Sequence, residues 1–228
     1  MYNCSNTKAG VCPDGGMAMD ARQAAQVMEE LRKLYPEAKP ELHFANPYET
    51  LIATILSAQC TDKRVNLVTA RLFPQYPDAF AMAKLEPEAL EPLIRECGLY
   101  HNKAKNIIAA SRALVERYDG KVPSTRKELM ALPGVGQKTA GVVLLAAFGD
   151  DQIPVDTHVF RVSRRIGLAD GNTPEKVEAQ LRDLLKRDIW SLGHHLIIWH
   201  GRRCCHARKP ECERCPMNEG LCEKHMEN

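Results

Sequence analysis

Four cysteines close to the C-terminal end have the residue type and spacing of metal ligands. They are Cys205, Cys212, Cys215 and Cys222, separated by six, two and six residues. Thiolates at such short separations can close on one metal centre, and ligation by sulfur alone suits zinc or an iron–sulfur cluster. The spacing does not distinguish between these two. Cys204 directly precedes the group and could replace one of its members.

The remaining cysteines bear on the compartment in which the protein works. The chain has nine cysteines in 228 residues, and its first 30 residues hold no apolar stretch of the secretory type. A reducing compartment is therefore expected, in which cysteines bind metal more readily than they form disulfides. Cys60 and Cys97 lie on helical stripes and are expected to be buried apolar side chains.

A glycine turn between two apolar segments is the second feature that could bind a ligand. Its sequence is Leu132-Pro-Gly-Val-Gly-Gln-Lys-Thr-Ala140. Gly134, Val135 and Gly136 would leave backbone N–H groups exposed at the start of a helix, where they and the helix dipole can hold a phosphate oxygen. Such a contact does not read bases. The alternative is an ordinary corner between two helices.

Lys138 and Asp156 are the candidate reacting groups. Lys138 is expected in the first turn of the helix after the glycine turn, where the positive helix end lowers the pKa of an amine and favours its use as a nucleophile. Asp156 lies eighteen residues further on, after Pro154, and can cap the next helix. A nearby carboxylate would raise the lysine pKa, so the two influences oppose each other. The alternatives are a solvated surface lysine and a simple helix cap.

The elements that must position these residues are all helical. Ala, Leu, Glu, Lys and Arg dominate, aromatic residues make up 6%, and no alternating strand pattern of convincing length occurs. The sequence predicts an all-α fold of about ten helices with short loops. The expected helices cover residues 20–35, 48–56, 63–73, 85–97, 103–118, 124–132 (capped by Ser124), 137–148, a segment from 156 onward, 174–186 and 189–200.

Charge and hydropathy exclude some classes of protein. Thirty-one Lys and Arg face 29 Asp and Glu, so any binding of nucleic acid must come from local arrangement and not from net charge. The longest strongly apolar run, Ala140–Phe148, is far shorter than the roughly 20 residues that a membrane-spanning helix needs. An integral membrane protein is therefore not expected.

In combination these motifs resemble the helix-hairpin-helix DNA glycosylases of the endonuclease III type. The resemblance runs in family order from about Leu31 to Glu223. It is carried by Leu56–Asp62, Gly98–Ala104, Leu132–Phe148, Val155–Arg161, His200–Arg202 and the four cysteines.

The resemblance implies a role for each of the candidate residues. Lys138 matches the catalytic lysine that attacks the sugar C1′ of a damaged nucleotide, expels the base and then cleaves the strand by β-elimination. Asp156 matches the aspartate expected to stabilise positive charge on the sugar. Gln59 and Leu99 match the residues that enter the duplex when the damaged base is extruded. For Leu99 the alternative is a place in the core.

The resemblance also implies a [4Fe–4S] cluster held by Cys205, Cys212, Cys215 and Cys222, although the last spacer is commonly five residues in the family and is six here. The cluster is expected to serve DNA docking rather than catalysis. Arg208 and Lys209, in the loop after the first ligand, would present positive charge to phosphates. Ser57 and Asp62 are plausible contacts to the base. His194, His195 and His200 are expected to have core or capping roles.

The implied architecture is a two-lobed helix-hairpin-helix glycosylase fold. After a flexible leader, a helical barrel ends with the hairpin, and an iron–sulfur domain joins the N-terminal helix to the C-terminal part. DNA would lie in the cleft between them, with Lys138 and Asp156 on opposite sides. The expected bounds are 1–20 for the leader, 40–150 for the barrel, and 21–39 plus 151–228 for the iron–sulfur domain.

The favoured function is a bifunctional DNA glycosylase and abasic-site lyase for oxidised or damaged pyrimidines. The expected partner is double-stranded DNA with a damaged base or abasic site, bound by a monomer with no membrane contact. The expected location is the cytoplasm, at the nucleoid in a bacterium. One alternative is a monofunctional adenine glycosylase of the same superfamily, which typically lacks a lysine at position 138 and has a further C-terminal domain. Another is a non-enzymatic DNA-binding or redox module, which Lys138 and Asp156 together argue against.

Overall fold

The computed structural model describes residues 19–218 and 220–222. Nearly all of the predicted leader, residues 1–20, lies outside the described residues. Every regular element within them is a helix, which confirms the prediction of an all-α fold. None of these helices combines the length and the apolar character that a bilayer crossing requires.

The chain divides into two compact units. One is continuous and covers Pro40–Gln152. The other is split in sequence, because it combines the residues before Pro40 with those from Ile153 onward. Each unit has its own apolar core; Pro40–Gln152 is the continuous unit and the other is the split unit.

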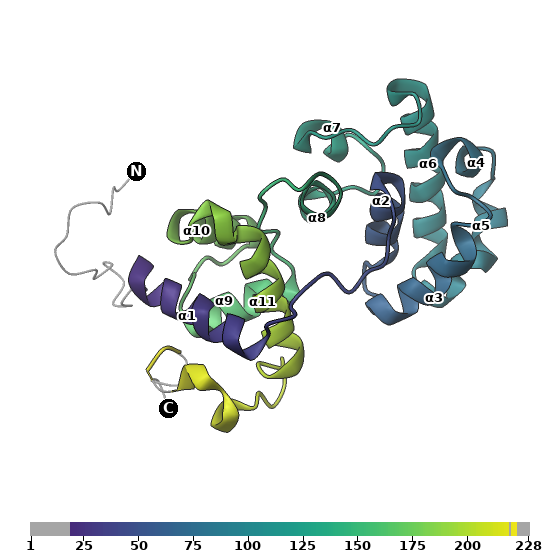
Figure 1. The fold of residues 1–228 in the computed structure, drawn as a ribbon. Coiled ribbons are helices and arrows are strands. Elements are labelled where there is room, and N and C mark those ends of the chain that lie inside the picture. Colours follow the sequence, from purple (N-terminus) through teal and green to yellow (C-terminus); the bar gives the residue numbers. More distant parts are fainter. Residues whose placement is uncertain (1–18, 219, 223–228) are drawn as a thin grey trace. The chain divides into compact units, whose positions relative to one another are not determined.

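The continuous unit is a group of helices around α6 and α2. Helix α6 lies beside α4 and α5, and α2 packs against α8 (Figure 1). Helix α2 begins at Pro47 under a cap from Asn46, and eight of its ten residues are buried, so that it forms the centre of the core. The elements are α2 (Pro47–Leu56), α3 (Asp62–Leu72), α4 (Ala79–Ala83), α5 (Pro87–Ile94), η1 (Arg95–Cys97), α6 (Tyr100–Tyr118), α7 (Arg126–Met130) and α8 (Gln137–Phe148).

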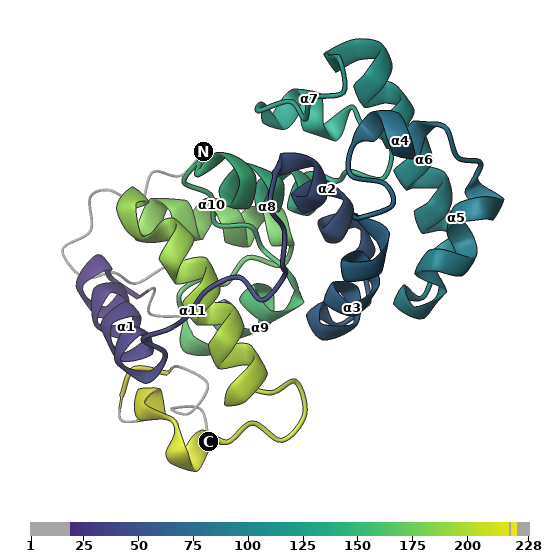
Figure 2. The ribbon, with the colours of Figure 1, turned by 45° about the vertical axis from the view of Figure 1, so that its right-hand side comes forward.

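The split unit is built around α11, which packs against α9 and α1 (Figure 2). Helix α1 comes from the other end of the chain and begins with a capping box between Asp20 and Gln23. Its apolar stripe is buried against residues from α9, α10, α11 and the C-terminal segment. The elements are α1 (Ala21–Leu34), α9 (Thr157–Ile166), α10 (Pro174–Leu184), η2 (Arg187–Ile189), α11 (Trp190–Arg203), η3 (Cys212–Arg214) and η4 (Pro216–Asn218).

Several predicted boundaries are wrong. Thr125 and not Ser124 caps α7, because its hydroxyl accepts the N–H of Glu128. Helix α6 begins at Tyr100 instead of Lys103, with Leu99 in a left-handed conformation before it. The expected helix over 85–97 is divided into α5 and η1. Helix α4 was not predicted, because its five residues are too few to show helical periodicity.

Candidate functional site

The glycine turn leads directly into α8. Gly134 has φ +75°, and a Cβ there would lie 2.7 Å from Cβ of Asn106, so the turn requires glycine at this position. The side chain of Val135 is buried in the core and anchors the turn from within. No side chain caps α8 at Gly136, and the first turn of the helix holds no acidic residue. The positive end of α8 is therefore open to an anion.

Lys138 lies in this first turn. It is the second residue of α8 and its side chain is exposed. An exposed amine beside uncapped backbone N–H groups can reach an electrophile whose flanking phosphate is held by the turn.

Asp156 is the N-cap of α9, as predicted. Its Oδ1 accepts the N–H groups of His158 and Val159, both at 2.8 Å. Among the described residues, no hydrogen bond reaches Oδ2. The carboxylate is thus held in one orientation by the helix end while one oxygen stays available. Asp156 belongs to the split unit and Lys138 to the continuous unit, and their opposition across a cleft stays a prediction.

Gln59 and Leu99 occupy two short segments with unusual backbone geometry. Gln59 has φ +52° and Leu99 has φ +49°, a region that non-glycine residues rarely adopt. Leu99 is 53% exposed, so the alternative that it belongs to the core is wrong. An exposed leucine held at a strained tip fits a side chain that inserts into another molecule.

A buried lysine connects the residues that precede these two segments. Nζ of Lys103 donates to the carbonyl oxygens of Leu56, at 2.9 Å, and Cys97, at 2.7 Å. The residue is only 4% exposed, and burial lowers the pKa of its ammonium group. The thiols of Cys60 and Cys97 also contact each other, and burial raises the pKa of Cys97 to about 12. Cys97 is buried as predicted, while Cys60 is half-buried.

The two predicted base contacts differ in their surroundings. Asp62, at the start of α3, lines an open hollow of about 390 Å³ with His43 and Asn66 among others. Ser57 is not among the lining residues, and its hydroxyl donates to the carbonyl of Thr54 at 2.8 Å. Their contact with a base stays a prediction.

The C-terminal cysteines gather at the edge of the split unit's core. Cys205, Cys215 and Cys222 all pack against it. Arg165 connects two of them, because its guanidinium donates to Sγ of Cys205 at 3.6 Å and its carbonyl accepts from Sγ of Cys222 at 3.2 Å. Three thiols at an apolar edge, with Cys212 in the same segment of the chain, are a donor set that fits an iron–sulfur cluster.

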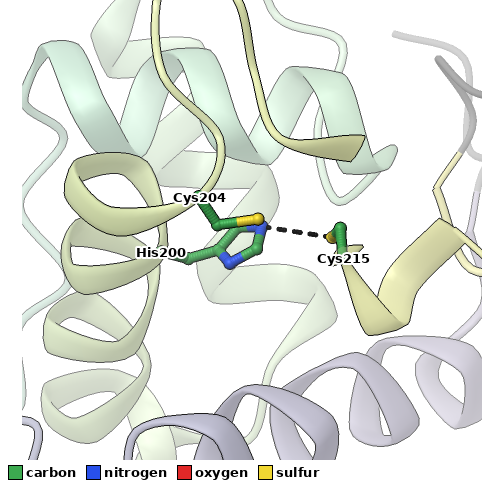
Figure 3. Close-up of side chains that lie close together, drawn as sticks. All are labelled: His200, Cys204 and Cys215. Carbon is green, nitrogen blue, oxygen red and sulfur yellow. Dashed lines mark hydrogen bonds between the residues drawn. The ribbon is translucent and has the colours of Figure 1, made fainter. Parts of the chain in front are cut away.

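The three histidines of α11 differ in their contacts. His194 and His200 are buried, and Nδ1 of His194 is 2.9 Å from the carbonyl oxygen of Pro154. Burial lowers the pKa of both His195 and His200 to about 4. Core or capping roles were predicted for these histidines, and His200 also contacts sulfur, since its Nε2 is 3.6 Å from Sγ of Cys215 (Figure 3).

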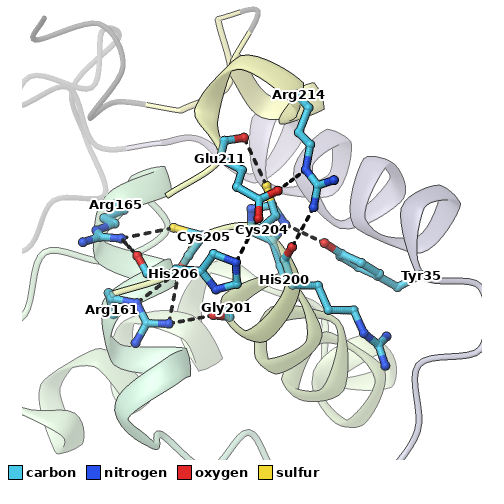
Figure 4. Close-up of polar contacts among 11 residues, drawn as sticks. Tyr35, Arg161, Arg165, His200, Gly201, Cys204, Cys205, His206, Glu211 and Arg214 are labelled. Carbon is cyan, nitrogen blue, oxygen red and sulfur yellow. Dashed lines mark hydrogen bonds and ion pairs between the residues drawn. The ribbon is translucent and has the colours of Figure 1, made fainter. Parts of the chain in front are cut away.

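Two arginines of α9 hold the segment that begins at Cys205 (Figure 4). Arg161 donates to the carbonyl oxygens of Gly201, at 2.9 Å, and Cys205, at 3.1 Å. Arg165 donates to the carbonyl oxygens of His206, at 2.6 Å, and Ala207, at 3.1 Å. These arginines, four residues apart on one helix face, were not singled out from the sequence, although Arg161 belongs to a motif that carries the resemblance.

The loop after Cys205 presents the two predicted phosphate contacts. Arg208 and Lys209 are exposed, and Lys209 has φ +52°. A hydrogen bond between Nε2 of His206 and the carboxylate of Glu211, at 3.2 Å, closes the loop, and Glu211 forms an ion pair with Arg214. Their contact with DNA stays a prediction.

Two family models match the chain. The model described as the HhH-GPD superfamily base excision DNA repair protein matches residues 52–187. The model of the iron–sulfur binding domain of endonuclease III matches residues 205–222, which begin and end at the first and last of the four cysteines.

Relatives and solved structures agree with these models. Endonuclease III of Synechocystis sp. is 47% identical over 88% of this chain and 92% of its own length. Endonuclease III of Escherichia coli K12 is 45% identical over 90% of this chain and 97% of its own length. A structure of a trapped endonuclease III–DNA covalent intermediate matches with a TM-score of 0.88 and 44% identity, over 92% of this chain and 98% of that one. The structure of a thermostable thymine-DNA glycosylase matches with a TM-score of 0.81 and 25% identity, over 91% of this chain and 98% of that one.

Proposed function

Because the chain belongs to the endonuclease III family of HhH-GPD base-excision repair proteins, we propose that Lys138 and Asp156 perform its DNA glycosylase and abasic-site lyase reactions. The protein is a DNA repair enzyme of this family. The observation that carries the residue assignment is the exposed Lys138 in the open first turn of α8, directly after the glycine turn.

The first reaction replaces the glycosidic bond. The Lys138 amine attacks C1′ while the C1′–N bond breaks, and the base leaves with the bonding electrons and takes up a proton. Positive charge develops on the sugar as this bond breaks. The carboxylate of Asp156, held by the N–H groups of His158 and Val159, stabilises that charge without having to reorient.

The second reaction cuts the strand. The nitrogen attached to C1′ loses one proton, the C1′–O4′ bond breaks and O4′ takes up a proton, which gives a protonated Schiff base between Lys138 and C1′. Removal of a proton from C2′ then expels the 3′ phosphate by β-elimination. Hydrolysis of the Schiff base returns the free amine.

The other candidate residues bind and open the duplex. The backbone of Gly134, Val135 and Gly136 holds a phosphate at the positive end of α8. Gln59 and Leu99 fill the space left by the extruded nucleotide and separate the opposite strand. Ser57 and Asp62 contact the base, and the preferred lesions are oxidised or damaged pyrimidines.

The chain binds an iron–sulfur cluster of the [4Fe–4S] type through its C-terminal domain. Cys205, Cys212, Cys215 and Cys222 would hold it. When bound, the cluster would supply a redox-active iron centre, and its cysteine ligands would fix the loop from which Arg208 and Lys209 contact DNA phosphates. The protein acts as a monomer in the cytoplasm, at the nucleoid in a bacterium.

Borohydride trapping on abasic duplex DNA tests the assignment. The wild-type protein is expected to nick this DNA and to form a covalent complex on reduction, because the Schiff base is reduced in place. In the Lys138→Gln variant, the rate of nicking and the yield of covalent complex should each fall by at least about 100-fold. The matched control is Lys127→Gln, which removes an exposed lysine of α7 and should behave as wild type.

A second variant separates the roles of Asp156. Asp156→Asn keeps an oxygen that can cap α9 but removes the charge, so folding should be retained while base release falls by about 100-fold or more. Equal trapping by Lys138→Gln and wild type would overturn the lysine assignment. Absence of nicking by the wild type would favour a purely DNA-binding role.

A further inference from the structure

A second group of metal-ligating side chains overlaps the predicted cluster cysteines (Figure 3). One ligand atom from each of His200, Cys204 and Cys215 lies within 4.8 Å of the other two. His200 and Cys204 are buried, at 1% and 5% exposure. Imidazole nitrogen and thiolate sulfur together are ligands that Zn²⁺ prefers.

The imidazole of His200 is oriented toward the sulfur atoms. Its Nδ1 lies 3.1 Å from the hydroxyl of Tyr35, a buried residue of the split unit. Its Nε2 lies 3.6 Å from Sγ of Cys215. Metal-binding histidines usually have such a partner on the second nitrogen, which fixes the ring orientation. Tyr35 thus leaves Nε2 as the ligand atom of His200.

Cys204 is surplus to the four cysteines assigned to the cluster. It precedes the segment that matches the iron–sulfur domain, residues 205–222. It is nevertheless held firmly, since its carbonyl oxygen accepts the N–H groups of His206, at 2.9 Å, and Glu211, at 3.0 Å. A buried thiol at a fixed position beside an imidazole has no part in the proposed DNA chemistry.

We propose that His200, Cys204 and Cys215 form an alternative site for a zinc-class divalent ion. Binding displaces the protons of the two thiols, and no group is oxidised or reduced. Water completes the tetrahedron. Because Cys215 is also assigned to the cluster, zinc and cluster exclude each other, and this exclusivity rests on the proposed ligation of the cluster by Cys215. The ion keeps the end of α11 joined to the C-terminal segment when the cluster is absent.

Cobalt titration of the full-length chain after removal of its cluster tests the site. Co²⁺ should bind one equivalent with the visible and charge-transfer bands of a tetrahedral thiolate site, and Zn²⁺ should displace it. Cys204→Ser should weaken Co²⁺ binding at least about 10-fold, whereas Cys212→Ser and Cys222→Ser should retain it. In the cluster-loaded protein, Cys204→Ser should keep the iron content of the wild type.

Tyr35→Phe provides a milder variant in case loss of His200 or Cys204 disturbs folding. It removes only the hydroxyl that orients the imidazole and should weaken Co²⁺ binding about 10-fold or more. The inference is overturned if cobalt binding depends on Cys212 and not on Cys204, or if Cys204→Ser loses iron. Zinc uptake by the cluster-loaded protein without loss of iron would overturn the exclusivity. None of these results depends on Lys138, so the proposed function is tested separately.

Discussion

Lys103 shows how one side chain can govern two distant segments. Its ammonium group donates to the carbonyl oxygens of Leu56 and Cys97, which precede the segments that carry Gln59 and Leu99. If these residues open the duplex, Lys103 is a positioning residue. Lys103→Met keeps the length of the side chain but leaves both buried carbonyls without this donor, and should destabilise the fold by about 1–3 kcal/mol.

The same variant should act differently on two kinds of substrate. Release of a base from duplex DNA is expected to fall about 10-fold or more, while release from an unpaired lesion should change much less, because no extrusion is needed. The measurement is kcat/KM on both substrates, with exposed Lys105→Met as the control. Equal losses on both substrates would assign Lys103 a structural role only.

His195 makes stability depend on pH. Burial lowers its pKa from 6.5 to about 4. As the pH falls from 6.5 toward 4, the unfolded chain takes up a proton here that the folded chain does not. The contribution of neutral His195 to the free energy of unfolding is therefore fully present above pH 6.5. It falls by on the order of 1–3 kcal/mol as the pH is lowered toward 4. Urea unfolding of His195→Gln at several pH values should show a flatter dependence, unlike exposed His43→Gln.

At this scale the sequence identifies residues better than it identifies contacts. Asp156 could be predicted as a cap, because the cap is local and follows Pro154. Lys103 could not, since a lysine within a helical pattern is normally solvated and its acceptors lie 47 and 6 residues away. The contact of His200 with Cys215 also depends on packing between α11 and the C-terminal segment, which no local pattern records.

Among the elements, the hairpin depends most directly on glycine. Gly134→Ala places a methyl group 2.7 Å from Cβ of Asn106 in a left-handed backbone conformation. We expect it to lower the free energy of unfolding by about 1–3 kcal/mol and to weaken DNA binding. Denaturant unfolding and a binding titration measure the two effects.

Gly136 offers a matched control for this prediction. A methyl group there would meet no atom within 4 Å, and its φ of −90° suits any residue. Gly136→Ala should therefore keep the stability of the wild type within about 1 kcal/mol. Equal destabilisation by both variants would show that the conformation of Gly134 is not the cause.

Helix prediction succeeds where periodicity is long and fails where it is short. Helix α1 has a capping box and a clear apolar stripe, and it was predicted nearly to its bounds. Helix α4 has five residues, and the start of α6 follows Leu99 with no side chain as a cap. Neither a single helical turn nor an uncapped start leaves a pattern in the sequence.

For the whole molecule, the positive loop after Cys205 should make DNA binding sensitive to salt. Lys209→Gln is expected to reduce the slope of log K against log salt by about 1, because one phosphate contact is lost. Lys33→Gln removes an exposed lysine that pairs with Glu30 on α1 and serves as the control. A slope unchanged by Lys209→Gln would remove this residue from the interface.

The split unit imposes an order on biosynthesis. Helix α1 is made early, but part of its packing surface is η4, which begins about 180 residues later at Pro216. At a translation rate of about 5–20 residues per second, this interval lasts roughly 10–40 s. Until this interval ends, Val27 and Leu31 lack part of the surface against which they pack in the folded protein. The continuous unit is synthesised completely before then and can fold first. The apolar face of helix α1 therefore stays exposed on the nascent chain for many seconds. A chaperone that binds apolar helices can bind α1 during this interval.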